Sequence, residues 1–267
     1  MRLRQPWGMT STGSLATMTI DNDDDLAGLE RSGAVVAEAR DAMVAAVVPG
    51  ISTGELDAIG RSVMRRHGAR SAPRLAYRFP GSTCISINDE AAHGIPSTTR
   101  RLRDGDLVNI DVSAELDGYW TDTGISVAVG SVTPTAQRLL EATKAAQRDA
   151  MRAARAGRRV SDLGRAVEKR ARSAGFSVVE NLCGHGVGRH IHEEPSIPSV
   201  EQRGDRTKLW EGLVIAIEPF LSTGATFVVE DPDGWTLRTP DGSLTAQFEH
   251  TVVVTRGEPL VLTASAA

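Results

Sequence analysis

The chain has 267 residues, of which 40% are hydrophobic and 24% are charged, a composition typical of a folded protein with a sizeable core. Its formal net charge of -4 at pH 7 argues against DNA as a partner, and no apolar run is long enough to cross a membrane. The two cysteines, Cys84 and Cys183, are too few for a disulfide framework, so we expect a cytoplasmic protein.

Residues 1–20 contain two arginines, no acidic residue and many small polar residues. They weakly resemble a transit peptide but lack the continuous apolar segment of a secretory signal. We therefore expect a flexible N-terminal tail over residues 1–20 and a single folded domain over residues 21–267. Met9 and Met18 leave open a later true start.

Two segments of the chain are similar to each other, one from Arg40 and one from Arg148. Each begins Arg-Asp-Ala-Met with a helical pattern, breaks at a glycine, resumes as a helix and is followed by strand-like sequence. Chance similarity between two alanine-rich helices is the alternative. The shared order of breaks and strands favours two related α+β halves, about residues 25–135 and 136–263, with a cleft where they meet.

Capping residues mark the second helix of each copy. Ser52 is followed three residues later by Glu55, the reciprocal capping arrangement, and Ser161 is expected to cap the equivalent helix. Gly68 and Gly175 are expected to end these helices because glycine readily adopts the left-handed conformation.

The segment VNIDVSAELDGYWTDTG, residues 108–124, predicts a β-hairpin with its turn at Asp117-Gly118. Asp111 and Asp122 lie on either side of the turn, and their odd separation puts both carboxylates on the same face. Like charges on neighbouring strands destabilise the pairing, so a positive group is expected between them. The alternative is a pair of solvated surface aspartates.

Two further acids interrupt apolar runs that we expect to be strands: Glu218 in LVIAIEPFL and Glu249 in TAQFEHTVVVT. Pro219 ends the first strand near Glu218, where a side chain can project into a cleft. Either glutamate alone is as well explained by a structural partner such as an arginine.

The segment CGHGVGRHIHEEP, residues 183–195, places His185 between glycines that allow the backbone to approach a ligand closely. One imidazole and four carboxylates are the composition of a site for two divalent cations, and the four negative charges balance the four positive charges. Oxygen-rich ligation favours Mn, Fe or Co, and Zn is possible.

Six segments in this order resemble type I methionine aminopeptidases, over about residues 25–263: SINDEAAHGIP, VNIDVSAELDGYWTDTG, CGHGVGRHIHEEP, AIEPFL, DGWTLRT and AQFEHTVVVT. The resemblance implies the α+β pita-bread fold, two pseudo-symmetric halves that form a curved antiparallel sheet covered by helices. It implies removal of the N-terminal methionine from peptides and nascent proteins. The metal ligands that it implies are Asp111, Asp122, His185, Glu218 and Glu249, with Asp122 and Glu249 bridging.

The resemblance also implies catalytic roles for His93, His192 and Glu218, in which both histidines contact the substrate. Glu218 would accept the proton of the attacking water, and His192 would donate to the carbonyl oxygen. The pocket for the methionine side chain is expected to include Cys84, Trp235 and either Tyr77 or Phe79, of which we favour Phe79. Ile191 stands where the family commonly has an aromatic residue. The resemblance therefore implies preference for methionine less firmly than it implies the hydrolysis itself.

Three other functions fit parts of this pattern. A proline-specific peptidase shares the fold but typically has an additional N-terminal domain, a non-enzymatic binding protein would not need all five ligands, and a dinuclear phosphatase would need a phosphate-binding loop. The basic second repeat is expected to be a solvated helix face, with transient ribosome contact as the alternative. We expect a monomer.

Overall fold

The computed structural model describes residues 18–265. Most of the expected tail lies outside this range, but its last three residues contact the second half of the domain. Met18 is buried, and Thr19 forms a bridge with Leu213. Between residues 18 and 265 no helix is both long and apolar enough to cross a bilayer.

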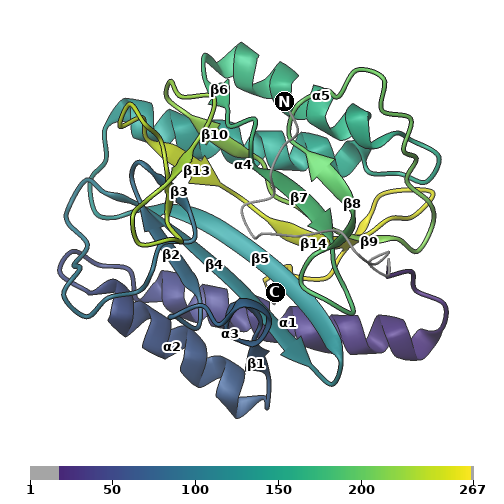
Figure 1. The fold of residues 1–267 in the computed structure, drawn as a ribbon, viewed down its shortest axis with the longest axis horizontal. Coiled ribbons are helices and arrows are strands. Elements are labelled where there is room, and N and C mark those ends of the chain that lie inside the picture. Colours follow the sequence, from purple (N-terminus) through teal and green to yellow (C-terminus); the bar gives the residue numbers. More distant parts are fainter. Residues whose placement is uncertain (1–17, 266–267) are drawn as a thin grey trace.

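The first half consists of two helices packed on a twisted sheet (Figure 1). Helix α1 (Asp23–Ala45) covers the hairpin of β4 (Leu107–Leu116) and β5 (Tyr119–Ala128), and helix α2 (Thr53–Arg66) packs beside α1. Two shorter strands, β1 (Arg70–Ser71) and β2 (Cys84–Ile87), pair with β4. Alternate apolar residues of β4, such as Ile110 and Val112, pack with Met43 and Leu56 from the helices.

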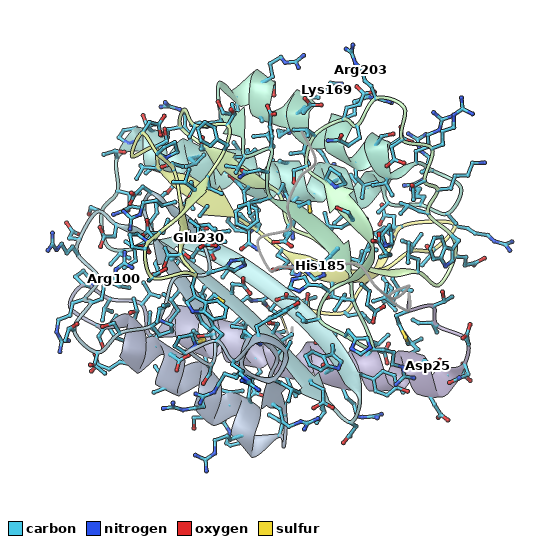
Figure 2. All side chains as sticks on the ribbon, in the orientation of Figure 1. Asp25, Arg100, Lys169, His185, Arg203 and Glu230 are labelled. Carbon is cyan, nitrogen blue, oxygen red and sulfur yellow. The ribbon has the colours of Figure 1, made fainter. Side chains whose placement is uncertain are left out.

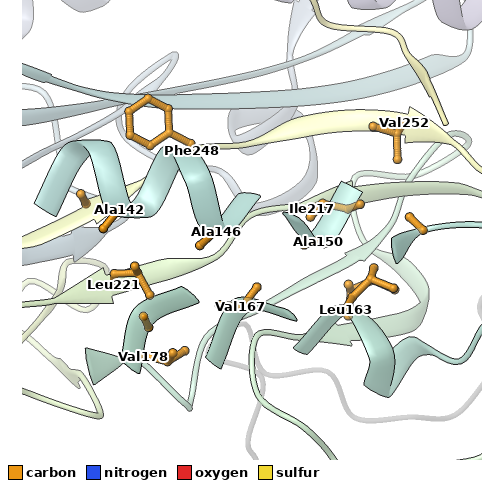
Figure 3. Close-up of a cluster of buried hydrophobic side chains, with 14 of the residues drawn as sticks. Ala142, Ala146, Ala150, Leu163, Val167, Val178, Ile217, Leu221, Phe248 and Val252 are labelled. Atoms are coloured by element: carbon orange, nitrogen blue, oxygen red, sulfur yellow. The ribbon is translucent and has the colours of Figure 1, made fainter. Parts of the chain in front are cut away.

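The second half repeats this order with α4 (Pro134–Ala153) and α5 (Val160–Ala174). Five strands follow in the spatial order β15-β14-β9-β7-β8. Their bounds are β7 (Cys183–Gly186), β8 (Glu193–Pro198), β9 (Val214–Ile217), β14 (His250–Val253) and β15 (Leu260–Val261). Figure 3 shows the core, in which Ala146 of α4 and Val167 of α5 lie beside Ile217 and Val252 from the strands.

Short elements complete the fold. Strands β6 (Ser177–Val178), β10 (Phe220–Ser222) and β13 (Thr245–Gln247) form one small sheet. Strands β3 (Glu90–Ala92), β11 (Val229–Glu230) and β12 (Leu237–Arg238) form another. Helix α3 (Ala72–Tyr77) connects β1 to the segment before β2.

The predicted fold class and the two-half organisation are confirmed. Figure 1 shows α1 and α2 along one side of the molecule and α4 and α5 along the opposite side, with the strands of both halves between them. All pairs between the strands are antiparallel. The fold is the helix-covered, curved antiparallel sheet of the pita-bread proteins.

The helix caps agree with the sequence in the first half and differ in the second. The Ser52 hydroxyl accepts a hydrogen bond from the backbone N–H of Glu55, and the Glu55 carboxylate accepts one from Ser52. The expectation that Ser161 caps α5 is wrong, because α5 begins at Val160, so that the cap position is Arg159, two residues earlier. Asp162 accepts a hydrogen bond from the backbone N–H of Arg159, the residue at the cap position, so the orphan donor there is satisfied without a serine.

Candidate active site

The β4–β5 hairpin brings Asp111 and Asp122 together, as predicted. Asp122 lies opposite Ser113, and Asp111 lies opposite Gly124, so the two carboxylates are diagonal neighbours on one face. The turn residues Asp117 and Gly118 have φ angles of 53° and 86°, as two-residue hairpin turns require.

Glu218 and Glu249 were expected within strands, and this is wrong in detail: each lies at a break between two strands. Glu218 and Pro219 separate β9 from β10, and Glu249 follows Phe248 between β13 and β14. Proline has no N–H for strand pairing, which explains the break at Glu218. At these breaks the side chains no longer alternate between the two faces of a strand, and both glutamates point towards the aspartates of the first half.

His185 comes from β7 and completes the cluster; Figure 2 shows it near the centre of the molecule. Its Nε2 atom lies 3.4 Å from Oε1 of Glu218 and 3.9 Å from Oδ2 of Asp122. Its Nδ1 atom lies 2.9 Å from the carbonyl oxygen of Gly186, so the proton belongs on Nδ1 and the Nε2 lone pair faces the carboxylates. A side chain at position 186 would collide with the Glu194 carbonyl oxygen, 2.1 Å from an added Cβ, which explains the glycine.

The geometry and chemistry of the cluster fit a divalent metal. Ligand atoms of Asp122, His185 and Glu249 all lie within 4.8 Å of one another. Oδ1 of Asp122 and Oε1 of Glu249 are buried without a hydrogen-bond partner, which is costly for a carboxylate unless a cation compensates it. Carboxylates with a single imidazole are ligands that suit divalent ions.

Burial and mutual repulsion alter the protonation of the cluster. Burial raises the pKa of Asp122 to about 6, and burial together with the charge of Asp122 raises the pKa of the other three carboxyls well above the usual range: Asp111, Glu218 and Glu249. Burial lowers the pKa of His185 to about 4, so its imidazole is neutral and available to bind a metal.

Two further histidines lie beside this cluster. The His192 ring stands 4.4 Å from the His185 ring, centroid to centroid. The Tyr77 hydroxyl forms a short hydrogen bond with Nδ1 of His192. Burial lowers the pKa of His93 to about 3, and burial followed by the proximity of His185 and His93 lowers the pKa of His192 well below its ordinary value.

The residues expected to bind the substrate side chain lie in two groups. Phe79 is buried and meets the Trp235 ring edge-on at 5.2 Å between centroids. Ile191 is buried in the apolar cluster that Tyr77 also contacts. Cys84 is buried opposite Asp111 in the β2–β4 register, where burial and then the nearby carboxylates raise the pKa of its thiol.

Sequence reasoning missed Gln247 and left Tyr77 open. The Gln247 Nε2 atom donates to Glu249 at 3.1 Å and to Glu218 at 3.4 Å, so its amide contacts two of the four carboxylates. Its position two residues before Glu249 is the signal that could have identified it, because side chains two apart on an extended segment share a face. Glu193 is buried and accepts three backbone hydrogen bonds.

Residues 27–256 match the metallopeptidase family M24. The chain is 49% identical to methionine aminopeptidase 2 of Bacillus subtilis over 92% of this chain and 99% of that protein. It is 46% identical to a methionine aminopeptidase of Staphylococcus epidermidis over 92% and 98% of the two chains.

Among solved structures, the methionine aminopeptidase of Rickettsia prowazekii superimposes with a TM-score of 0.88 at 36% identity, covering 92% of this chain and all of that one. The methionine aminopeptidase of Thermotoga maritima gives a TM-score of 0.90 at 30% identity, over 93% and 100% of the two chains. A prolidase from Pyrococcus furiosus gives 0.73 at 26% identity and matches 94% of this chain but only 66% of its own length.

Proposed function

This chain belongs to the metallopeptidase family M24, and from that premise we propose how its buried cluster removes the N-terminal methionine of peptides and nascent proteins. The activity is the one named for its bacterial relatives: the chain is a metal-dependent hydrolase, a methionyl aminopeptidase. The observation that carries the proposal is the pair of buried, unpartnered carboxylate oxygens of Asp122 and Glu249 beside the His185 imidazole.

Five side chains are proposed to hold two divalent ions: Asp111, Asp122, His185, Glu218 and Glu249. Asp122 and Glu249 would hold the ions at the centre of the cluster, since each has one buried carboxylate oxygen without a hydrogen-bond partner. Four carboxylates balance two divalent ions in charge, which offsets the cost of burying them. Mn, Fe or Co suits this oxygen-rich set better than a structural zinc, although Zn can occupy it.

Divalent ions held by these residues would lower the pKa of a water molecule and polarise the scissile carbonyl. Glu218 is the proposed general base, which accepts the proton of the attacking water and passes it to the departing amine. Its position at the break between β9 and β10 leaves the carboxylate beside the His185 imidazole and within reach of the Gln247 amide.

His192 is proposed to donate a hydrogen bond to the carbonyl oxygen as negative charge develops there. The Tyr77 hydroxyl at Nδ1 supports this role, because a donor at Nδ1 leaves the proton of the neutral ring on Nε2. The lowered pKa of His192 keeps the ring neutral, and so it acts as a hydrogen-bond donor without a formal positive charge beside the metal site. His93 is proposed to contact the scissile amide.

The methionine side chain is proposed to lie against Phe79, Trp235, Cys84 and Ile191. The α-amine of the substrate, with a reference pKa of roughly 8, can bind a metal when deprotonated, and this restricts cleavage to the first residue. An aliphatic Ile191 in place of a ring is expected to change preference among first residues by about 1 kcal/mol or more. An aminopeptidase with altered first-residue specificity is therefore the second candidate.

We propose that the enzyme acts in the cytoplasm as a monomer on chains leaving the ribosome. The chain has only two cysteines, too few for a disulfide framework, as expected in a reducing compartment. The basic helices α4 and α5 are a candidate ribosome contact, but several of their arginines already form ion pairs, such as Arg170 with Asp149 and Arg165 with Glu201. Affinity for ribosomes that falls when unpaired arginines are neutralised would support the contact.

The test of the function is a metal titration. Metal-depleted protein is titrated with Mn, Fe, Co and Zn while cleavage of the peptide Met-Ala-Ser is measured, with an X-Pro peptide as the control for prolidase activity. We expect cleavage with at least one metal and its loss in Asp122→Asn. Absence of cleavage with every metal would overturn the enzymatic function, and equal cleavage of peptides with other first residues would favour altered specificity.

A further inference from the structure

The loop between β7 and β8, residues 187–192, carries two residues of the proposed reaction. Ile191 is buried at the substrate side, and His192 stands beside His185. The position of this loop therefore sets both the donor to the carbonyl oxygen and one wall of the substrate pocket. Residues from three separate parts of the chain contact this loop: the segment at Met18, helix α1 and the β4–β5 hairpin.

Backbone hydrogen bonds attach the loop at its start. The Trp120 N–H on β5 donates to the Gly188 carbonyl oxygen at 2.8 Å. The Glu193 carboxylate accepts from the backbone N–H groups of Arg189 at 2.6 Å, His190 at 2.7 Å and Met18 at 2.6 Å. These bonds hold the backbone of residues 188–190, and the Arg189 side chain adds a further attachment.

The Arg189 side chain attaches the loop to the tip of the β4–β5 hairpin and to α1. Its Nη2 atom lies 2.7 Å from Oδ1 of Asp25, and its Nη1 atom lies 3.4 Å from the Gly118 carbonyl oxygen. Its guanidinium carbon lies 4.1 Å from the centre of the Tyr119 ring, a cation–π contact. Tyr119 in turn donates to the same Asp25 oxygen at 3.1 Å, so the four residues form one connected group.

Asp25 is the anchor of this group. Its side chain is only 9% exposed, although it lies in the first turn of α1 near one end of that helix (Figure 2). A buried carboxylate needs a charged or hydrogen-bonding partner, and Arg189 supplies the positive charge. The planar guanidinium can pair with a carboxylate and stack on a ring at the same time, which an ammonium group cannot do.

We propose that Arg189 is a positioning residue for the proposed reaction: it docks the loop that carries Ile191 and His192 onto the hairpin tip and α1. The inference rests on the role of His192 in the proposed function. Arg189 itself touches no reacting atom. Its effect comes through the distance between the His192 donor and the carbonyl oxygen, to which reaction rates are highly sensitive.

The chain offers a matched control. Arg170 has the same side-chain exposure as Arg189, 43%, and also pairs through Nη2 with an aspartate at 2.7 Å, Asp149 on α4. Its pair joins α4 and α5, away from the metal cluster. Arg170→Ala therefore removes an equivalent ion pair without touching the loop.

The experiment compares wild type, Arg189→Ala, Arg189→Lys and Arg170→Ala, each loaded with Mn. For each protein we measure kcat and KM for Met-Ala-Ser, Mn affinity by calorimetry, Tm, and amide hydrogen exchange of residues 187–192. We expect Arg189→Ala to lower kcat by ~10-fold or more and to speed exchange in the loop, with Mn affinity unchanged. Arg189→Lys keeps the positive charge near Asp25 but lacks the planar guanidinium, so it should recover only part of kcat. Arg170→Ala should match wild type.

The proposal is overturned if Arg189→Ala keeps kcat and loop exchange within about twofold of Arg170→Ala. It is also overturned if Mn affinity and Tm fall in proportion to kcat, because that is the result of general destabilisation. The proposed function fails separately: wild type and Arg170→Ala would then be inactive with every metal. In that case faster loop exchange in Arg189→Ala alone would still establish the docking contact, and unchanged exchange would contradict it.

Discussion

At the scale of single residues, Gln247 links the proposed ligands to the framework of the first half. Its Oε1 atom accepts from Nδ2 of Asn109 at 2.7 Å, which orients the amide so that Nε2 faces Glu218 and Glu249. Its backbone N–H donates to the Ser126 hydroxyl oxygen at 2.9 Å. The side chain thus holds two carboxylates of the second half through contacts with β4 and β5.

Replacement of Gln247 by Leu should weaken metal binding. The substitution removes the only amide donor described here between the two carboxylates, within residues 18–265, and residues that orient metal ligands typically contribute 10- to 100-fold in affinity. We expect Mn affinity, measured by calorimetry, to fall by about tenfold. Gln137→Leu is the control, because the Gln137 side chain is exposed and donates a hydrogen bond to Glu141 on α4. Equal Mn affinity in the two variants would contradict the role of Gln247.

At the scale of elements, the strongest sequence signals were those with a local physical cause. The Asp117-Gly118 turn needs positive φ angles, and the odd spacing of Asp111 and Asp122 follows from strand alternation, so both predicted the hairpin correctly. The reciprocal cap of α2 was also predicted correctly, because it depends only on Ser52 and Glu55, which are close in sequence. Such signals depend only on neighbours in sequence.

Elements that depend on distant partners were either not predicted or wrong in detail. Strand β7 is glycine-rich and has no strand propensity of its own; it is extended because it pairs with β9 and β8. The breaks at Glu218 and Glu249 arise where the chain turns towards the other half, which no local pattern records. The hydrogen bond from Tyr77 to His192 joins residues 115 apart, so the sequence left the choice between Tyr77 and Phe79 open.

Gly124 on β5 shows how the hairpin accommodates the site. A Cβ at this position would lie 2.2 Å from Oε1 of Gln247, so the glycine allows the Gln247 side chain to lie across the strand. Gly124→Ala should therefore displace Gln247 and, with it, Glu218 and Glu249. We expect a loss of about 1–3 kcal/mol in the free energy of unfolding together with weaker Mn binding.

The control for Gly124→Ala is Gly164→Ala on α5. There an added Cβ would lie 2.3 Å from the backbone carbonyl oxygen of Val200, an equally close contact that is less easily relieved, in a region with no proposed ligand. Denaturant unfolding and Mn calorimetry are measured for both variants. Loss of stability in both with weaker Mn binding only in Gly124→Ala supports the prediction, whereas an equal effect on Mn binding would assign it to instability alone.

At the scale of the whole molecule, the proposed metal site joins the two halves. Asp111 and Asp122 come from the first half, and the other three ligands come from the second. The same junction carries direct bonds: the Glu249 N–H donates to the Gly124 carbonyl oxygen at 2.8 Å, and the Asp122 N–H donates to the Thr251 hydroxyl oxygen at 2.9 Å. Bound cations should therefore stabilise the fold by an amount set by their affinity and concentration, because the unfolded chain has no such site.

The pH dependence of metal-free stability has two opposing contributions. Buried histidines with lowered pKa bind fewer protons in the folded state than in the unfolded state, so they favour folding as pH rises towards about 6.5 and contribute no slope above it. This group comprises His93, His185, His192 and His250. Carboxyls with raised pKa do the reverse: the folded state binds more protons, so stability falls as pH rises until their folded pKa is passed.

Above about pH 7 the histidines no longer contribute, so the groups with raised pKa set the slope: the carboxyls and, towards the ordinary thiol pKa of about 8.5, Cys84, whose contribution has the same sign. The carboxyls with strongly raised pKa values are those of Asp111, Glu218 and Glu249. We therefore expect the metal-free protein to lose stability between about pH 7 and 8.5. The loss is up to about 1.4 kcal/mol per pH unit for each of these groups that still holds its proton. Mn takes the place of these protons, and so the Mn-loaded protein should lack this slope and bind Mn more tightly at higher pH. Thermal unfolding of chelator-treated and Mn-loaded protein across this range measures both. A metal-free Tm that does not fall with pH over this range would mean that the carboxylates are ionised without a cation, and the buried cluster would then need another source of positive charge.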